Sequence, residues 1–173
     1  MTVTNTTNIT TAAVGNGSNI TFSFSPMVIF ASTDVVVTKT TLATGVEEIL
    51  TAGLSSSTYK VNIAALGYPA TGSIQYPAVG GTPMADTHSI KIKRVLPLTQ
   101  TVDLQNQGGY FPDTQETTID KLTMMILQLK EELDRCIKLP KSASAIATET
   151  DLPTASQTLK ITAAGTGIEW VTV

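Results

Sequence analysis

The sequence has few of the residues that make catalytic centres, metal sites and disulfides. Among its 173 residues there is one cysteine and one histidine. One cysteine cannot form a disulfide within the chain or a cysteine cage for a metal ion. The histidine, His88, stands beside a candidate strand, where a lone histidine is most often a surface residue. Metal catalysis, a Ser-His-Asp triad and a bound cofactor are therefore not expected.

Charged residues are also sparse. They make up 14% of the chain, with a formal net charge of -3, whereas 42% of the residues are hydrophobic. A chain of this composition collapses rather than staying disordered. The densest basic stretch is KIKR at residues 91–94, whose charges alternate with or flank apolar residues, as on the solvent face of a strand. Nucleic-acid binding needs a larger positive footprint and is not expected.

Long apolar runs are missing as well. No stretch approaches the roughly 18 apolar residues of a membrane span. The first residues, MTVTNTTNITTAAV, have neither the positive region nor the apolar core of a signal peptide. We therefore expect no membrane insertion. Aromatic residues are 5% of the chain and the only tryptophan is Trp170, so no aromatic platform for a carbohydrate is apparent.

The sequence does contain a series of short strand patterns. Apolar and β-branched segments alternate with turn residues about every 8–12 residues, which is typical of a sandwich. The candidate strands are residues 20–24, 27–30, 34–39, 46–50, 59–63, 72–77 and 88–96. The continuous apolar run at 27–30 suits a fully buried strand, and in the last strand Ile90 and Ile92 should point inward. We predict a mainly β chain, with an antiparallel β-sandwich at 20–96 and an extended or partly ordered arm at 1–19.

Residues 116–138 predict the one helix, about 35 Å long. Apolar residues recur there at alternating steps of three and four through three heptads, at Ile119, Leu122, Ile126, Leu129, Leu133 and Cys136. In heptad terms Ile119, Ile126 and Leu133 take position a and the other three take position d. Asp113 with Glu116 fits a capping box, Thr117 or Thr118 is the alternative N-cap, and Pro140 ends the helix.

A helix with one apolar seam must bury that seam. One alternative is that the seam lies on the chain's own sandwich; the other is that it packs against further copies as a coiled coil. Isoleucine at a with leucine at d favours a parallel dimer. Met124, Met125 and Leu127 widen the apolar surface, which favours a trimer or a helix also contacted by another part of the protein.

The segments beside the helix are a connector at 97–115 and a tail at 139–173. In the connector Pro97 limits strand pairing, and Gly108 and Gly109 allow backbone geometry closed to other residues, so these two glycines are candidate hinges. The tail predicts a linker followed by a short β-hairpin near 158–171. Two short strands are only marginally stable alone, so the hairpin needs a partner surface.

The run from residue 94 to 140 resembles the N-terminal attachment region of tail fibres and tailspikes from short-tailed bacteriophages. The family pattern is an arginine near a strand end, a P-x-T-Q-x-x-D-L connector, a Gly/aromatic element and a helix of the form D-x-L-T-x-x-x-Q-x-L-x-E-E-L-D-R. It is carried here by Arg94, Pro97, Thr99, Gln100, Asp103, Leu104, Asp120, Leu122, Thr123, Gln128, Leu129, Glu131, Glu132, Leu133, Asp134 and Arg135. The segment FSFSPMVIFASTDVVVTKT is similar to the family's early strands. Cys136 departs from the pattern, since a larger aliphatic residue would pack better at a d site.

The resemblance implies a homotrimeric structural protein of the virion with no enzymatic activity. Its sandwich would dock on the adaptor or nozzle proteins of the tail, and its helix would form the trimer interface through Ile119, Leu122, Met125, Ile126, Leu129, Leu133 and Cys136. Pro97, Gln100, Gly108 and Gly109 would form the connector or hinge. Because the chain stops at Val173, we expect a short tail fibre, a fibre adaptor, or one part of a longer fibre.

The distal end of such a protein would meet a receptor-binding fibre protein or a host surface glycan, and Ile168, Trp170 and Val171 are the candidate junction. A hairpin inside the trimer, with Trp170 as core, is the alternative for these residues. Two further functions stay open: the N-terminal part of a glycan-cleaving tailspike, and a stand-alone carbohydrate-binding β-sandwich.

Overall fold

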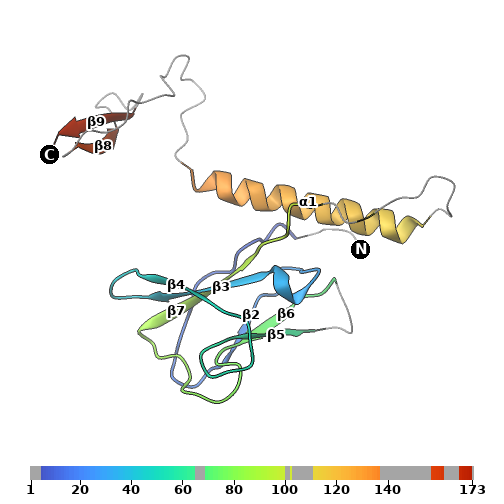
Figure 1. The fold of residues 1–173 in the computed structure, drawn as a ribbon, viewed down its shortest axis with the longest axis horizontal. Coiled ribbons are helices and arrows are strands. Elements are labelled where there is room, and N and C mark those ends of the chain that lie inside the picture. The colour runs from blue at the N-terminus through green and yellow to red at the C-terminus, as the bar shows by residue number, and fades with distance from the viewer. Residues whose placement is uncertain are drawn as a thin grey trace. The chain divides into compact units, whose positions relative to one another are not determined.

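The computed structural model describes residues 5–64, 69–99, 102, 111–136, 157–161 and 168–172. The chain divides into two compact units, Met1–Asp134 and Arg135–Val173. Figure 1 labels the helix and most of the strands of the two units. Each unit is considered by itself below.

The larger sheet of the first unit has four antiparallel strands in the order β1-β7-β3-β4. Its strands are β1 (Ala13–Val14), β3 (Val35–Thr41), β4 (Glu47–Leu50) and β7 (His88–Arg94). In the register of the sheet Val37 stands between Ile92 on β7 and Leu50 on β4. All three side chains are buried, so the inward face predicted from strand alternation is confirmed.

The smaller sheet has three antiparallel strands in the order β2-β6-β5. They are β2 (Thr21–Ser23), β5 (Lys60–Ile63) and β6 (Gly72–Gln75). Phe22, Ile74 and Val61 lie side by side across it. A Cβ atom at Gly72 would stand 2.1 Å from the Asn62 carbonyl oxygen, so the close approach of β5 and β6 there requires glycine.

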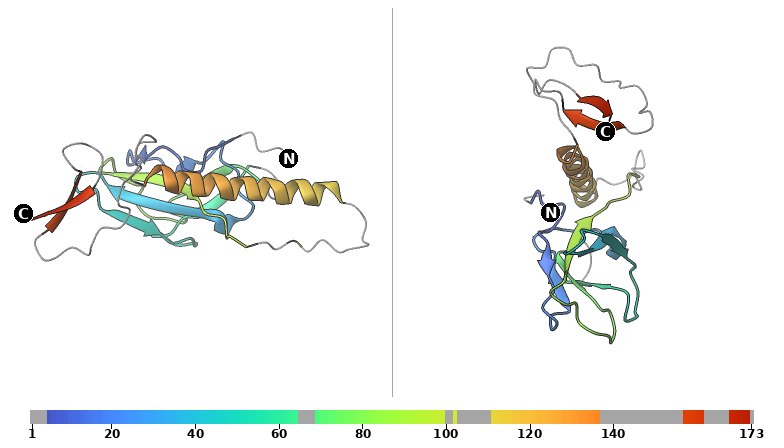
Figure 2. Two further views of the ribbon diagram at one scale, coloured as in Figure 1. Left: turned by 90° about the horizontal axis from the view of Figure 1, so that it is seen from above. Right: turned by 90° about the vertical axis from the view of Figure 1, so that its left-hand side faces the viewer.

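The hydrophobic core fills the space between the two sheets, which Figure 2 shows as two layers. Its buried members come from every strand of these two sheets except β1 and β5 and from the loops between strands: Phe22, Phe24, Met27, Ile29, Val35, Val37, Leu50, Tyr59, Ile74, Met84, Ile90 and Ile92. The predicted mainly β fold with antiparallel sheets is therefore confirmed for the described part of the chain.

One segment differs from its prediction, and a second, predicted as extended or partly ordered, has pairing that was not predicted. Residues 27–30 form no strand: Met27 and Ile29 are buried, but Ile29 makes only a single bridge, to Ala70. A short apolar run marks burial and does not by itself specify a ladder. A 3-10 turn, Ser32–Asp34, follows it. The second segment is the arm, which adds β1 to the edge of β7, with a further bridge between Ile9 and Lys93.

Among its described residues, the second unit contains the antiparallel pair of β8 (Gln157–Ile161) and β9 (Ile168–Thr172). Its register sets Leu159 opposite Trp170 and Ile161 opposite Ile168. The candidate junction residues Ile168, Trp170 and Val171 therefore all lie on β9, and Val171 is half-buried.

Candidate oligomerisation surface on the helix

The helix of the first unit, α1, spans Pro112–Asp134. It begins four residues before the predicted start, with proline at the first helical position, where its missing N–H is not needed. Asp113 therefore lies inside the first turn and not at the N-cap, so the predicted capping box and its alternatives are wrong. The hydroxyl of Thr117 instead donates to the Asp113 carbonyl at 2.8 Å. Cys136 lies just beyond the last helical residue and is exposed.

One side of α1 contacts the sandwich. Asp120, Met124 and Gln128, spaced four residues apart, are its buried positions. Gln128 Oε1 accepts a 2.8 Å hydrogen bond from the backbone N–H of Leu96, two residues beyond the end of β7. This bond is buried, and Leu96 itself is 1% exposed. The side-chain amide thus satisfies a backbone donor that the sheet leaves without a ladder partner.

Charged groups extend this contact along the helix. Lys93 of β7 pairs with Glu131 at 3.2 Å and also with Glu132. Nearer the start of α1, Lys121 Nζ donates to the Thr99 carbonyl at 3.3 Å. The helix is therefore held to the sandwich mainly by polar groups, with Met124 as the buried apolar contact.

The opposite side of α1 carries the predicted seam, and it is exposed. The seam residues have exposed fractions of 62% for Ile119, 57% for Leu122, 58% for Ile126, 50% for Leu129 and 60% for Leu133. At about 100° per residue, their mean direction lies about 180° from that of Asp120, Met124 and Gln128. The alternative in which the seam lies on the chain's own sandwich is therefore wrong.

The three further apolar residues of the helix, Met124, Met125 and Leu127, lie in different environments. Met124 is buried against the sandwich, and Leu127 is half-buried. Met125, predicted for the trimer interface, is half-buried and lines a pocket. Contact with another part of the protein therefore accounts for Met124, as one of the sequence alternatives proposed.

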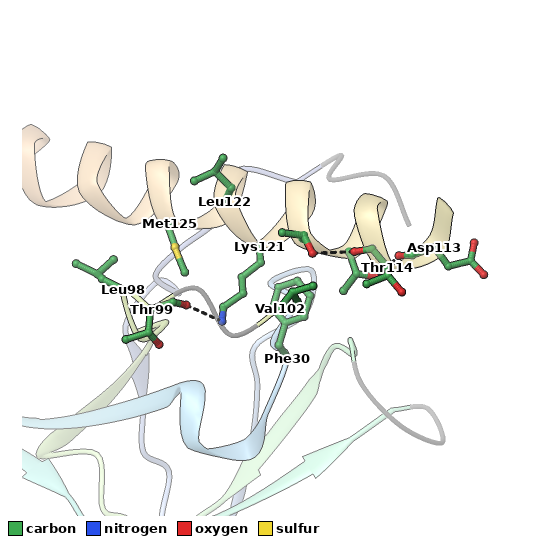
Figure 3. Close-up of a pocket in the computed structure, with 11 residues that line it drawn as sticks. Phe30, Leu98, Thr99, Val102, Asp113, Thr114, Lys121, Leu122 and Met125 are labelled. Carbon is green, nitrogen blue, oxygen red and sulfur yellow. Dashed lines mark hydrogen bonds between the residues drawn. The ribbon is translucent and has the colours of Figure 1, made fainter. Parts of the chain in front are cut away.

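The pocket, about 660 Å³ in volume, lies beside the first half of α1. Figure 3 shows Phe30 and Val102 on one side of it and helix residues on the other, with the Lys121–Thr99 hydrogen bond at one edge. Leu122 also lines it, so the pocket adjoins the seam. Sequence reasoning missed this pocket because it depends on where the loop with Phe30 comes to lie.

The position of Arg94 also differs from its prediction. It was expected on a solvent face, but it is 1% exposed. Its Nη1 donates to the Val28 carbonyl at 2.8 Å, and Nε and Nη2 have no hydrogen-bond partner among the described residues. Burial lowers the pKa of the guanidinium, and the nearby charge of Asp34 acts in the opposite direction. Asp34 accepts backbone hydrogen bonds from Phe30 and Ala31, at 2.9 and 2.8 Å.

The remaining predicted site residues lie partly outside the described residues. Pro97 is exposed, whereas Gln100, Gly108 and Gly109 are not among the residues that the structure describes. Within the described ranges, no cluster of three or more His, Cys, Asp or Glu side chains is placed to hold a metal ion. Nor is any helix there long and apolar enough to span a membrane.

The described residues define a mainly β chain with an amphipathic helix, and comparison with known proteins narrows this class. No family model matches the chain. It is similar to the tail spike protein of Salmonella phage epsilon15, with 33% identity over 129 residues, which is 73% of this chain and 11% of that protein. The chain thus spans about a tenth of the length of the curated relative it matches. This similarity supports a structural protein associated with the tail of a phage virion.

Proposed function

We propose that the chain is a homotrimeric attachment module of a phage tail, in which α1 forms the trimer axis and the sandwich binds the tail. The observation that carries the proposal is the exposed heptad seam on the side of α1 away from the sandwich. With the sandwich on the other side, copies of α1 can pack together while their sandwiches stay outside the bundle.

Burial of the seam would favour association. Five large aliphatic side chains, each half or more exposed, would be covered. At about 25 cal/mol per Å² of apolar area, this amounts to about 1 kcal/mol for each side chain, or about 5 kcal/mol per protomer before the entropic cost of association. A helix of this length depends on such packing for much of its stability.

The proposal of three copies, and not two, rests on a different observation. Isoleucine at a and leucine at d favour two strands, and the contact of Met124 with the sandwich removes one reason for a third. Three copies are supported by the resemblance of the connector and helix to trimeric tail fibres. A short tail fibre or a fibre adaptor is the form we propose, with β9 as the junction to a distal receptor-binding protein or a host surface glycan.

A charge in the seam tests the proposal. Analytical ultracentrifugation of the wild type should give a mass three times the 18.2 kDa of the chain. Ile126→Asp should reduce it to the monomer, because an aspartate at the centre of the seam would be buried without a partner. Thr117→Asp, an exposed helix position outside the seam, is the matched control and should stay trimeric.

A wild type that is monomeric at micromolar concentration would refute the assembly. The parallel orientation of the helices in the trimer is checked separately with Leu129→Cys in a Cys136→Ser background. Oxidation should link two protomers of each trimer, since like positions meet only when the helices are parallel and in register. Failure to cross-link in a stable trimer would argue for another arrangement.

Cleavage of a glycan is the second candidate, because the relative is a tail spike protein. Glycoside hydrolysis needs two carboxyl groups facing a substrate across a cleft. The adjacent pair Glu47 and Glu48 is exposed on β4, and Glu48 pairs with Lys39 at 2.6 Å. We therefore propose that this chain has no such activity. Release of reducing sugar from host capsule by the purified chain would contradict this.

A further inference from the structure

The outer edge of β7 is covered by residues 5–14, here called the arm strand. Its pairing with β7 includes the Ile9–Lys93 bridge and the short strand β1. The arm strand advances four residues, from Ile9 to Ala13, while its partners on β7 move back three, from Lys93 to Ile90. One residue is therefore left over, as at a β-bulge. This pairing is less regular than that of β3, which pairs with every residue of β7.

The arm strand adds little to the hydrophobic core. Of its residues, all of which the structure describes, Asn8 is the only buried one. Ala13 is partly buried against the core, and Val14 is 54% exposed. Burial of apolar area is the main favourable term in folding, so the core would lose little if the arm strand were released.

The buried side chain of the arm strand has polar atoms without partners. Asn8 is 3% exposed, and neither polar atom of its side-chain amide has a hydrogen-bond partner among the described residues. Asn8 stands opposite Arg94, whose backbone N–H donates to the Asn8 carbonyl at 2.9 Å. Residues opposite each other in an antiparallel pair point to the same face, so both side chains point inward. Because its amide loses water without gaining a hydrogen bond, Asn8 opposes the docking of the arm strand.

Arg94 has the complementary requirement. Its Nη1 donates to the Val28 carbonyl, whereas Nε and Nη2 have no partner in the described part of the chain. These two nitrogens can bind one carboxylate through two parallel hydrogen bonds. Asp34 is the nearby acid, but its Oδ2 accepts two hydrogen bonds from backbone N–H groups of its own loop. A carboxylate in the place of Asn8 would satisfy this edge of the guanidinium from the neighbouring strand.

The arm strand is held mainly by hydrogen bonds at the edge of the sheet. Thr10 N–H donates to the Ile92 carbonyl at 2.9 Å, and the Thr10 hydroxyl accepts from the Ile92 N–H at 3.0 Å, where a regular ladder would use a carbonyl. Hydrogen bonds at an edge are replaced by bonds to water when the edge opens, so their net contribution is small. β7 stays paired with β3 on its other side, so the sandwich can remain folded when the arm strand leaves.

We propose that the arm strand is displaceable, and that the freed edge of β7 accepts an extended strand of another protein chain that carries a carboxylate opposite Arg94. An added strand satisfies the edge through main-chain hydrogen bonds, and the carboxylate provides selectivity because it pairs with the guanidinium that the arm strand leaves unsatisfied. The inference goes beyond the proposed function and does not depend on it, since it concerns an edge of the sandwich and not the seam of α1.

Hydrogen exchange of the full chain, measured by NMR, tests the release. The amides of Thr10 and Arg94 bond across the pairing with the arm strand. They should exchange at least tenfold faster, after correction for intrinsic rates, than the amides of Lys91 and Lys93, which strand alternation directs toward β3. Equal protection of the two sets would show that the arm strand opens only with the whole sandwich, and would overturn the inference.

The selectivity is measured with fluorescent peptides that copy residues 5–14 and are added to the full chain. The peptide with Asn8→Asp should bind at least tenfold more tightly than the peptide with the natural sequence, because its carboxylate can pair with Arg94. Thr11→Asp, which adds the same charge at an exposed position, is the matched control and should bind like the natural peptide. Equal binding of the two acidic peptides, or no binding of either, would contradict the proposal.

A disulfide that holds the arm strand in place shows where the peptide binds. Ile9→Cys/Lys93→Cys in a Cys136→Ser background joins two residues that face each other in the register. The same protein is compared oxidised and reduced, so that loss of the Lys93 pairs with α1 is common to both states. Oxidation should abolish binding of the Asn8→Asp peptide, and reduction should restore it. Binding that persists after oxidation would place the peptide elsewhere and refute the assignment of the β7 edge.

Discussion

Tyr59 shows at the residue scale how the two sheets are joined. Its ring is 4% exposed within the core, and its hydroxyl donates a buried 2.6 Å hydrogen bond to the Val35 carbonyl at the start of β3. Tyr59 precedes β5 of the smaller sheet, so this bond links the two layers. Burial raises the pKa of the Tyr59 hydroxyl above its ordinary value of 10.0.

Replacement of this tyrosine gives a pH-dependent prediction. Tyr59→Phe should lower the free energy of unfolding by about 1 kcal/mol at pH 7, the usual worth of one hydrogen bond. Because the folded-state pKa is raised, the stability that Tyr59 contributes is fully present below pH 10.0 and is lost as the pH rises through the folded-state value. Urea denaturation from pH 7 to 11 should therefore show the two proteins converging. A constant difference across that range would contradict the prediction.

Arg94 shows why a prediction from residue type alone was wrong. Strand alternation places it on the same face as Ile90 and Ile92, which were correctly predicted to point inward. The misreading came from giving its charge more weight than its position. Alternation held because the backbone fixes the direction of each side chain, and a nearby acid offsets part of the cost of burying the guanidinium.

At the element scale, regular patterns were predicted well and contacts between elements were not. The alternating segments became β2, β3, β4, β5, β6 and β7, and the heptad segment became α1. The prediction of a strand at 27–30 was wrong because this apolar run has no alternation of apolar and polar residues that would specify pairing. The side of α1 that meets the sandwich had no apolar pattern to reveal it, since two of its three buried residues, Asp120 and Gln128, are polar.

The contact of Gln128 with Leu96 can be tested directly. Gln128→Ala leaves the buried Leu96 N–H without an acceptor and should cost about 1–3 kcal/mol. Hydrogen exchange measured by NMR should show the Leu96 amide losing protection. Lys130→Ala, at an exposed position of the same helix, should change stability by less than about 0.5 kcal/mol. Equal protection of Leu96 in both variants would show that the contact does not hold the helix.

At the scale of the whole molecule, the chain consists of two compact units. Ending the chain after Cys136 should leave the melting temperature of the first unit within about 2 °C and its oligomeric state unchanged, because the sandwich, the seam and their contacts all lie before that point. Calorimetry and analytical ultracentrifugation of the shortened chain check this. Loss of the oligomer would show that β8 and β9 contribute to assembly.

The hydrogen bond between Gln128 and Leu96 also has a mechanical consequence. Gln128 is sixteen residues into α1, about 24 Å from its start, yet it is joined directly to the end of β7. A pull on the far end of α1 would reach β7 directly through this bond and the Lys93 pairs. These contacts would have to break before bending at the predicted hinge, Gly108 and Gly109, could reorient the sandwich. The tension at which the contacts break would therefore determine when the hinge can act.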